Sequence, residues 1–285
     1  MAIVGADFQI HTSKKEMKKV ILITGISSGF GKAASGLLAE AGHIVYGTVR
    51  RDCETDKAVK IVRMDLTDIS SMKAAVEKII KEEGRIDVLI NNAAMHSAGP
   101  VETIPDEFIK IQCDTNFLGM VHLTRSVLPH MRKQGGGLII NFSSIGGLMG
   151  LPYHAFYSAF KFAIEGFSES LRMEVKKFNI NVVVINPGDF NTGNTSARKN
   201  FLAPTGQDDP YNRDFMNALA VMEKNEMGGK NPAFLARKIV KIVGCRHPNQ
   251  RYIIGAWYEK AAVKLKYILP GKVFRWILET NYKIR

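Results

Sequence analysis

The fold is decided by the stretch Val20-Ile21-Leu22-Ile23-Thr24-Gly25-Ile26-Ser27-Ser28-Gly29-Phe30-Gly31. A short apolar run typical of a buried strand, residues 19–24, ends directly at Gly25, and small residues with helical character follow at residues 32–41. Glycines at such a bend let the backbone turn tightly and approach a pyrophosphate group, whose charge the N-terminus of the following helix stabilises. The spacing is G-x-x-x-G-x-G rather than the common G-x-G-x-x-G. The turn alone is therefore open to two interpretations, a nucleotide site or a plain tight turn.

The rest of the chain continues the alternation of strand and helix. Patterns typical of buried strands recur at residues 43–49, 60–64, 85–90, 137–142 and 179–185. Helical spacing of apolar residues is found at residues 70–83, 117–133 and 157–178. Strict alternation implies right-handed crossovers and a parallel sheet. We expect one doubly wound α/β domain, a Rossmann-type parallel sheet with helices on both faces.

The composition is that of an ordinary globular protein, with 285 residues of which 46% are hydrophobic and 23% charged. The three cysteines, Cys53, Cys113 and Cys245, lie far apart and form no C-x-x-C, so we expect no disulfide framework and no metal site. The first 19 residues lack the apolar core of a signal peptide. No apolar run reaches the roughly 18 residues that span a bilayer. We expect a cytoplasmic protein that is attached at most to a membrane surface.

The net charge is +12, and half of it lies in the last 35 residues. From Arg251 to Arg285 there are eight Lys or Arg against Glu259 and Glu279, a net charge of +6. The excess lies among apolar residues rather than in a recognised nucleic-acid module. We therefore expect no nucleic-acid partner.

Three parts of the chain differ in composition and in the pattern of apolar residues. Residues 1–18 form an N-terminal extension, residues 19–256 the catalytic domain, and residues 257–285 a basic amphipathic extension. After Pro187-Gly188, residues 189–232 are an irregular segment of about 44 residues rich in Asn, Asp, Gly, Pro and Thr. An irregular segment of this length is more often functional than a plain connector, so we expect a substrate lid there.

A second candidate site is the stretch Tyr157-Ser158-Ala159-Phe160-Lys161 at the start of a predicted helix. The spacing places the Tyr157 phenol and the Lys161 ammonium on one helix face. A close cation favours the phenolate, so we expect Lys161 to lower the pKa of Tyr157 toward the working pH. In a Lys-rich chain such a pair also arises by chance, as a solvated helix face.

Other polar motifs follow the predicted strands in order. Three of these motifs stand at the end of a predicted strand, namely Asn91-Asn92-Ala93-Ala94, Ser143-Ser144 and Asn186-Pro187-Gly188. Asn116 begins the motif Asn-Phe-Leu-Gly, and Thr192 follows the last of the predicted strands. In a parallel sheet these strand ends share the carboxyl edge, where ligands bind. Together with the glycine turn and the Tyr157–Lys161 pair, this ordered set resembles the short-chain dehydrogenase/reductase family, most closely its steroid and retinol dehydrogenase branch. The match runs from about Val20 to Thr192.

The resemblance implies roles for four catalytic residues. Tyr157 would donate a proton for carbonyl reduction or accept one for alcohol oxidation. Lys161 would hold the nicotinamide ribose and bias Tyr157 toward ionisation. Ser144 would hydrogen bond the reacting oxygen, and Asn116 would anchor a water of the proton relay.

The resemblance also implies a set of cofactor contacts. Asp65 with Leu66 would meet the adenine, and Thr192 the carboxamide. The family usually has glycine at the position of Ala94, which can narrow the space beside the cofactor. The full set of expected cofactor residues is Gly25, Ser27, Ser28, Gly29, Phe30, Gly31, Arg50, Asp65, Leu66, Asn92, Ala93, Tyr157, Lys161, Pro187, Gly188, Phe190 and Thr192.

The end of the second strand favours NADP(H) over NAD(H). NAD enzymes of this fold place an acid there, whereas Arg50 and Arg51 precede the first acid, Asp52. An arginine suits a 2′-phosphate, and Arg50 aligns with the phosphate-binding arginine of steroid dehydrogenases. The alternative is that both arginines belong to a solvated turn.

The substrate is expected to be a bulky apolar ketone or alcohol of steroid or retinoid type. The stretch between Ser144 and Tyr157 is apolar and very like that of the steroid and retinol branch. We expect the substrate to meet Ser144, Met95, Met149, Tyr153 and Tyr157, with apolar residues of the lid. Met and aromatic residues at such spacing can equally be core. His96 and His154 are expected to be pocket wall or surface rather than catalysts.

The C-terminal extension contains two amphipathic pieces. If residues 257–269 are helical, Tyr258, Leu265 and Ile268 share one face with the lysines off it. Pro270-Gly271 breaks the pattern before a second apolar piece. Three roles stay open, namely a basic anchor on anionic lipid, a cover for the pocket, and a dimer contact.

The sequence thus predicts an NADP-dependent oxidoreductase that interconverts a ketone and a secondary alcohol, or an aldehyde and a primary alcohol. The alternative is a cofactor-binding regulatory protein on the same fold without turnover, a class that usually lacks the tyrosine or the lysine. Relatives commonly assemble through helices matching residues 117–133 and 157–178, so we expect a homodimer or homotetramer.

Overall fold

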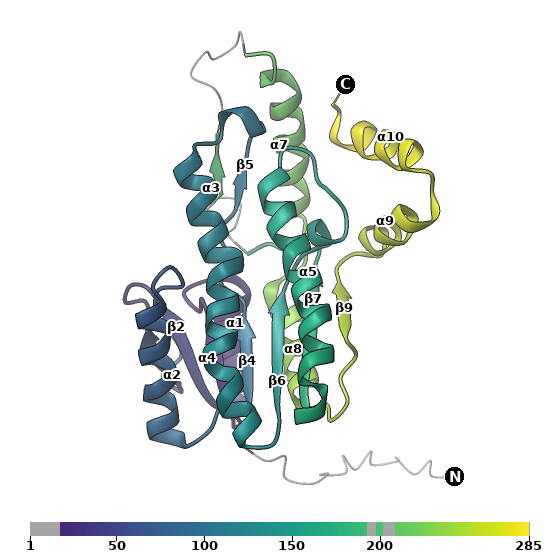
Figure 1. Cartoon of the computed structure of the whole chain (residues 1–285). Coiled ribbons are helices and arrows are strands. Elements are labelled where there is room, and N and C mark those ends of the chain that lie inside the picture. The colour runs from purple at the N-terminus through teal and green to yellow at the C-terminus, as the bar shows by residue number, and fades with distance from the viewer. Residues whose placement is uncertain (1–17, 193–197, 202–208, 285) are drawn as a thin grey trace, which may run out of the picture.

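The computed structural model describes residues 18–192, 198–201 and 209–284. Within these residues, seven parallel strands form one sheet in the order β3-β2-β1-β4-β6-β7-β9 (Figure 1). The predicted doubly wound parallel sheet is confirmed. The strands are β1 (Val20–Thr24), β2 (Ile44–Val49), β3 (Val59–Arg63), β4 (Val88–Asn91), β6 (Gly137–Phe142), β7 (Ile180–Pro187) and β9 (Arg251–Ile254).

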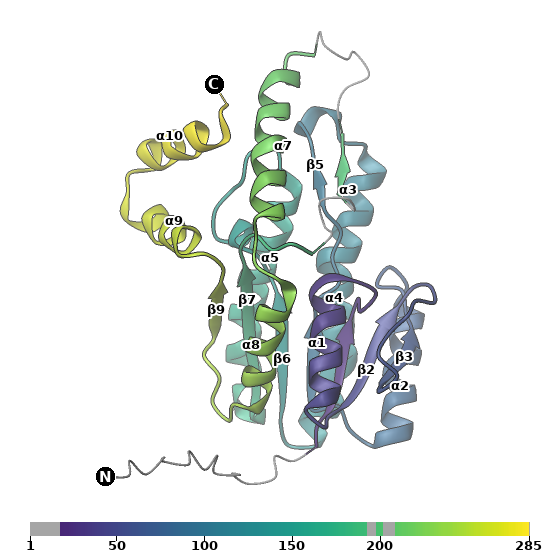
Figure 2. The same ribbon diagram turned by 180° about the vertical axis from the view of Figure 1, so that it is seen from behind.

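Helices cover both faces of the sheet because its central strands are apolar on both sides. In β1, Ile21 and Ile23 pack into the core beneath one helical layer, while Val20 and Leu22 pack into the core beneath the other. The first layer consists of α1 (Gly29–Glu40) and α8 (Pro232–Gly244), seen in front in Figure 2. The second layer consists of α2 (Ile69–Glu83), α4 (Gly119–Lys133) and α5 (Ala155–Val175).

The strand order changes direction at β1. Its neighbours are β2 on one side and β4 on the other, so the connections lead away from β1 toward opposite edges of the sheet. A crevice opens at such a point, outside the carboxyl ends of the strands, and ligands of α/β proteins bind there. The glycine turn follows β1 at this point.

Smaller elements stand above this edge of the sheet. They are β5 (Ser97–Ala98), which pairs with β8 (Lys199–Asn200), α3 (Asp106–Cys113), the π-helical turn Asp114–Leu118 and α7 (Asn212–Met227). Single 3-10 turns lie at Val101–Thr103, Ile145–Gly147 and Lys176–Phe178.

The prediction of an irregular segment over residues 189–232 is wrong for α7. Phe215, Leu219 and Met222 recur at helical spacing and are buried, so they form the apolar face of a helix. Residues 193–197 and 202–208 of the expected lid, including Leu202, lie outside the described residues, as do residues 1–17 of the N-terminal extension and Arg285.

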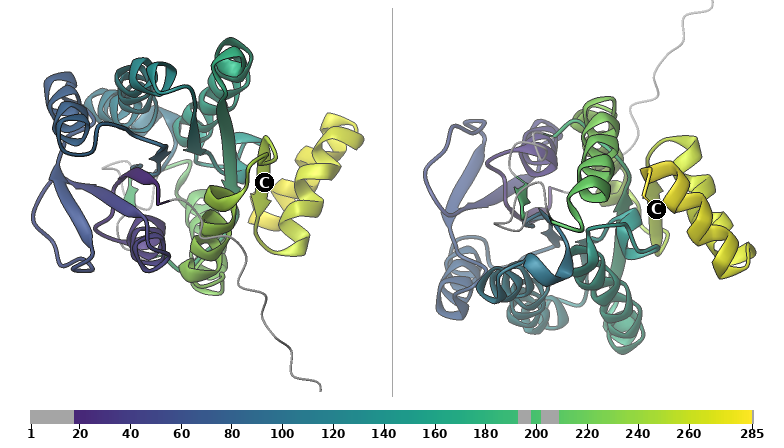
Figure 3. Two further views of the ribbon diagram at one scale, coloured as in Figure 1. Left: turned by 90° about the horizontal axis from the view of Figure 1, so that it is seen from below. Right: turned by 90° about the horizontal axis from the view of Figure 1, so that it is seen from above.

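The C-terminal extension folds as α9 (Trp257–Ile268) and α10 (Gly271–Tyr282), separated at Pro270 as expected (Figure 3). The predicted apolar face of residues 257–269 is only partly buried. Ala262 and Leu269 of that face pack with Val263 and Phe274 against Ile145 and Leu148, whereas Ile268 is 74% exposed. None of the described helices is long and apolar enough to cross a membrane.

Candidate active site

The glycine turn is clamped to the end of β4 by hydrogen bonds. The Thr24 hydroxyl accepts from the backbone N–H groups of Asn92 and Ala93, both at 3.0 Å. The Asn92 amide donates in return to the carbonyl oxygens of Thr24 at 2.8 Å and Gly25 at 3.1 Å. Gly25 has φ +71°, a left-handed conformation that favours glycine. A Cβ on Gly31 would lie 2.1 Å from the Gly25 carbonyl oxygen, so this position admits no side chain.

A cavity of about 280 Å³ opens beside this turn at the N-terminus of α1. The Ser28 side chain forms no capping hydrogen bond to that helix, so its N-terminal N–H groups suit a phosphate. The cavity is lined by every residue of the expected cofactor set except Gly31, which packs beneath the turn. The residues present therefore fit a dinucleotide.

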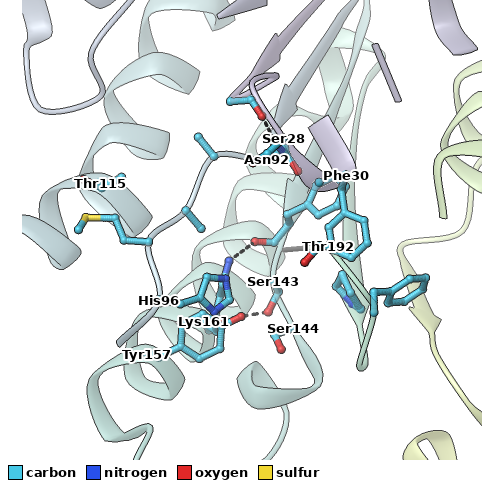
Figure 4. Close-up of a pocket in the computed structure, with 18 of the residues that line it drawn as sticks. Ser28, Phe30, Asn92, His96, Thr115, Ser143, Ser144, Tyr157, Lys161 and Thr192 are labelled. Atoms are coloured by element: carbon cyan, nitrogen blue, oxygen red, sulfur yellow. Dashed lines mark hydrogen bonds between the residues drawn. The ribbon is translucent and has the colours of Figure 1, made fainter. Parts of the chain in front are cut away.

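Three of the four predicted catalytic residues, Ser144, Tyr157 and Lys161, line this cavity together (Figure 4). Tyr157 and Lys161 lie on one face of α5, with the ammonium 5.6 Å from the centre of the phenol ring. Ser144, at the end of the loop after β6, hydrogen bonds the Tyr157 side chain. The Lys161 ammonium donates to the carbonyl oxygen of Phe142 at 2.8 Å. This hydrogen bond fixes the position of the ammonium in the cavity wall.

Burial reverses the expected effect of Lys161 on Tyr157. It raises the pKa of Tyr157 to about 12, with smaller contributions from the carboxylates of Glu226 and Asp189, while the Ser144 hydrogen bond opposes the rise. Burial also lowers the pKa of Lys161 to about 8. The predicted lowering of the tyrosine pKa is therefore wrong for the chain by itself, because the loss of solvation dominates and Lys161 is not among the groups that shift this pKa.

Two histidines flank the phenol and stay neutral. The His96 ring lies 4.6 Å from the Tyr157 ring, centre to centre, and the His154 ring 5.7 Å. Burial, with nearby cations, lowers the pKa of His96 to about 3 and that of His154 to about 4. The expectation that they form pocket wall agrees with this placement, since both line the cavity.

Residues 19–202, more than half of the chain, match the family model for short-chain dehydrogenases. The chain belongs to the short-chain dehydrogenase family. The "3-ketodihydrosphingosine reductase" of Bacteroides thetaiotaomicron is 46% identical over 94% of this chain and 99% of its own length. The "uncharacterized oxidoreductase YusZ" of Bacillus subtilis is 34% identical over 92% and 98% of the two chains.

Solved structures agree with this family assignment. A short-chain dehydrogenase from Streptomyces avermitilis superimposes with a TM-score of 0.74 and 28% identity, covering 92% of this chain and 99% of the other. A second, from Burkholderia phymatum in complex with NAD, has a TM-score of 0.76 over 90% and 95% of the two chains, at 20% identity. The family thus shows this chain to be an oxidoreductase of a class that uses a nicotinamide cofactor.

Some predicted residues of this short-chain dehydrogenase lie elsewhere than expected. The Asn116 amide is bound to the backbone of Met95, whose N–H donates to it at 2.7 Å and whose carbonyl oxygen accepts at 2.9 Å. Its role in holding a water stays a prediction. Met95 lines the cavity as expected, but Met149 packs against α9 and α10, and Tyr153 packs against Phe215 at 5.2 Å. The last two placements correct the predicted substrate set.

Sequence reasoning missed an acidic wall of the cavity. Asp189 directly follows Pro187-Gly188 at the end of β7, and Glu226 comes from α7. Tyr282 of α10 lines the same cavity. Asp189 could have been found from its position directly after the strand-end motif, whereas Glu226 and Tyr282 reach the site only through the folding of later helices.

Replacing Tyr157 with phenylalanine is expected to lower turnover at least 100-fold while cofactor affinity stays within about threefold, because the ring still packs and only the proton is lost. Reduced-nicotinamide absorbance gives the rate, and cofactor fluorescence gives the affinity. Tyr153→Phe is the matched control, since Tyr153 lies outside the cavity. Turnover near that of the wild type in the Tyr157 variant would remove the phenol from the reaction.

Proposed function

We propose that this chain reduces the ketone of a long-chain sphingoid base such as 3-ketodihydrosphingosine, with NADPH as the hydride source. The observation that carries the substrate class is the relative of that name, 46% identical over nearly the whole length of both chains. The complete set of Ser144, Tyr157 and Lys161 around one cavity supports turnover over a regulatory protein that only binds cofactor. A steroid- or retinoid-like substrate stays a prediction.

The side chains suit carbonyl reduction. The hydroxyls of Ser144 and Tyr157 are hydrogen bonded to each other beside the cavity, so a carbonyl oxygen placed between them meets two donors. The bound reduced nicotinamide supplies the hydride to the carbonyl carbon. Tyr157 then gives its proton to the oxygen, and the nearby Lys161 ammonium stabilises the phenolate left behind.

The raised pKa of Tyr157 keeps the phenol in the protonated form from which reduction starts. A phenol with a pKa of about 12 carries its proton throughout the neutral range, so by itself it is a poor base for alcohol oxidation. The neutral imidazoles of His96 and His154 add no cation that would ionise it. The site therefore rests in the protonation state that reduction requires.

NADPH is favoured by the charges at the end of β2. Arg50 lines the cavity beside Thr48 and Val49. The nearest acid in sequence, Asp52, is bound to the Arg63 guanidinium by two contacts, so it is engaged away from a ribose hydroxyl. Arg50 forms no ion pair with a carboxylate of the described residues, and such a guanidinium suits a 2′-phosphate.

The substrate proposal is tested with NADPH and three ketones, namely 3-ketodihydrosphingosine, a steroid ketone and all-trans-retinal. We expect kcat/KM for the sphingoid ketone to exceed the other two at least 100-fold, because the apolar residues Ile145, Leu151 and Met222 of the cavity lining offer a surface to a slim alkyl chain. Absorbance of the reduced nicotinamide and identification of the alcohol product are the readouts. Preference for the steroid or the retinoid would overturn the proposed substrate class.

The cofactor proposal is tested with Arg50→Ala and the matched control Arg51→Ala, since Arg51 does not line the cavity. A charge-assisted hydrogen bond contributes about 1.5 to 3 kcal/mol, so kcat/KM for NADPH should fall about 10- to 100-fold in the Arg50 variant. The value for NADH should stay within about threefold in both variants. A wild type that already prefers NADH would contradict the proposal.

A further inference from the structure

The two acids of the cavity wall differ in their partners, although the Arg198 cation acts on both, as an ion pair with Glu226 and at longer range on Asp189. Glu226 forms an ion pair with Arg198 at 2.7 Å, and Glu223 lies 3.8 Å from the same guanidinium. Asp189 forms no ion pair with any lysine or arginine of residues 18–192, 198–201 and 209–284. The Asp189 carboxyl group instead forms a hydrogen bond with the Glu259 carboxyl group. Burying two like-charged groups next to each other costs free energy.

Glu259 cannot turn away from Asp189. Its carboxylate accepts from the backbone N–H of Asp189 at 2.5 Å and from that of Ala256. It lies so close to Gly188 that a Cβ there would be 2.3 Å from the Glu259 oxygen. Two carboxyl groups are therefore held together beside Tyr157, and burial together with this neighbour raises the pKa of Asp189 to about 7.

A second polar group faces the same cavity with one nitrogen unsatisfied. His154 is 7% exposed and lines the cavity, and its imidazole has a backbone hydrogen bond to Pro152, but its Nδ1 meets no hydrogen-bond partner by distance and angle within the described part of the chain. A buried nitrogen of this kind is normally satisfied in the functional state. Together with the carboxyl pair, it indicates that a polar headgroup belongs next to the reacting carbonyl.

We infer that Asp189 is the specificity residue for an ammonium group on the carbon next to the ketone, with His154 as the hydrogen-bond partner of a neighbouring hydroxyl. The inference rests on the proposed function, since 3-ketodihydrosphingosine is a 2-amino-1-hydroxy-3-ketone. The ammonium would supply the positive charge that the carboxyl pair lacks. The alkyl chain would then leave along the apolar side of the cavity, toward Leu151 and Met222.

The test compares two ketones of equal length, the 2-amino-1-hydroxy-3-ketone and its analogue without the amine. We expect the wild type to prefer the amino ketone in kcat/KM by about tenfold or more, the value of one charge-assisted hydrogen bond. Asp189→Asn should reduce this ratio to about threefold or less, and Asp189→Glu, which keeps the charge, should retain most of it. Asp106→Asn, an exposed acid on α3, is the matched control.

The outcomes separate the two proposals. If the wild type reduces neither ketone, the proposed function fails. If it reduces both equally well, or if Asp189→Asn keeps the preference, the ammonium subsite is wrong while the ketone reductase stands. Should both Asp189 variants fold poorly, a wild type without the preference still overturns the ammonium subsite.

A second, independent inference comes from the outer face of α9 and α10. Both tryptophans of the chain lie there, Trp257 with 80% and Trp276 with 64% of its surface exposed. Ile268 is 74% and Tyr267 69% exposed. The helices α9 and α10 project from the rest of the molecule (Figure 3). Large exposed apolar side chains on a projecting element mark a contact surface.

Basic residues flank this face. Along α9, Trp257, Leu265 and Ile268 share the exposed side, opposite the buried Glu259 and Val263. Lys260 and Lys264 beside them are exposed, as are Lys272 and Arg275 beside Trp276 on α10. The only acids of the two helices are Glu259, which is buried, and Glu279.

We propose that this outer face docks on an anionic lipid surface. Exposed tryptophans set among lysines are suited to the headgroup region of a bilayer, and the net positive charge complements anionic lipid. The inner side of the same helices supplies Tyr282 to the cavity, so docking would bring the cavity close to the membrane. A second copy of this chain, with its own net charge of +12, complements the face less well.

Co-sedimentation with vesicles tests this proposal on the full chain. We expect binding to vesicles of equal parts phosphatidylcholine and phosphatidylserine, and at least tenfold weaker binding to phosphatidylcholine alone. Trp257→Ala with Trp276→Ala should abolish binding, and Lys260→Gln with Lys264→Gln should weaken it about tenfold. Met173→Ala, an exposed apolar residue on α5, is the control. No sedimentation with anionic vesicles, or a dimer in light scattering that the tryptophan variant dissociates, would overturn the proposal.

Discussion

The hydrogen bonds between Thr24 and the Asn92–Ala93 backbone are the constraint on which the site depends. They join the end of β1 to the end of β4, the two strands between which the sheet changes direction. The Asn92 amide returns to the glycine turn, so turn and strand ends form one rigid unit. Because this unit sets the N-terminus of α1, it also sets where phosphates can bind, and thereby where a nicotinamide would meet Tyr157.

The fold was predictable because each central strand is buried on both faces. Residues such as Ile21 and Leu22 leave a continuous apolar run in the sequence, and short glycine turns mark its ends. The helix α7 escaped prediction because Asn, Asp and Gly around it suggested a loop, although Phe215, Leu219 and Met222 carry the helical spacing. In this segment the helical spacing of the apolar residues decides the structure, and the loop-like content of Asn, Asp and Gly does not.

Within the site, residues adjacent to strand ends were predictable and those delivered by tertiary packing were not. Residues at the strand ends form most of the cavity lining, since the geometry of a parallel sheet brings its strand ends together. Met149 faces α9 and α10 instead of the cavity, which depends on a helix pair more than 100 residues later in the chain. The pKa of Tyr157 was misjudged for the same reason, because desolvation depends on everything packed around the phenol and not on Lys161 alone.

The C-terminal helices belong to the site as much as the Rossmann core does. Glu259 of α9 is bonded to the backbone directly after Gly188, and Tyr282 of α10 lines the cavity, so the extension and the cavity cannot move independently without breaking these contacts. The carboxyl groups of Glu226 on α7 and Asp189 after β7 raise the pKa of Tyr157 beyond what burial alone does. A phenol that stays protonated serves a reductase, and Asp189 is also the acid of the proposed ammonium subsite. Because Glu259 of α9 holds the backbone of Asp189, the C-terminal extension bears on the site through contacts that the family motifs do not contain.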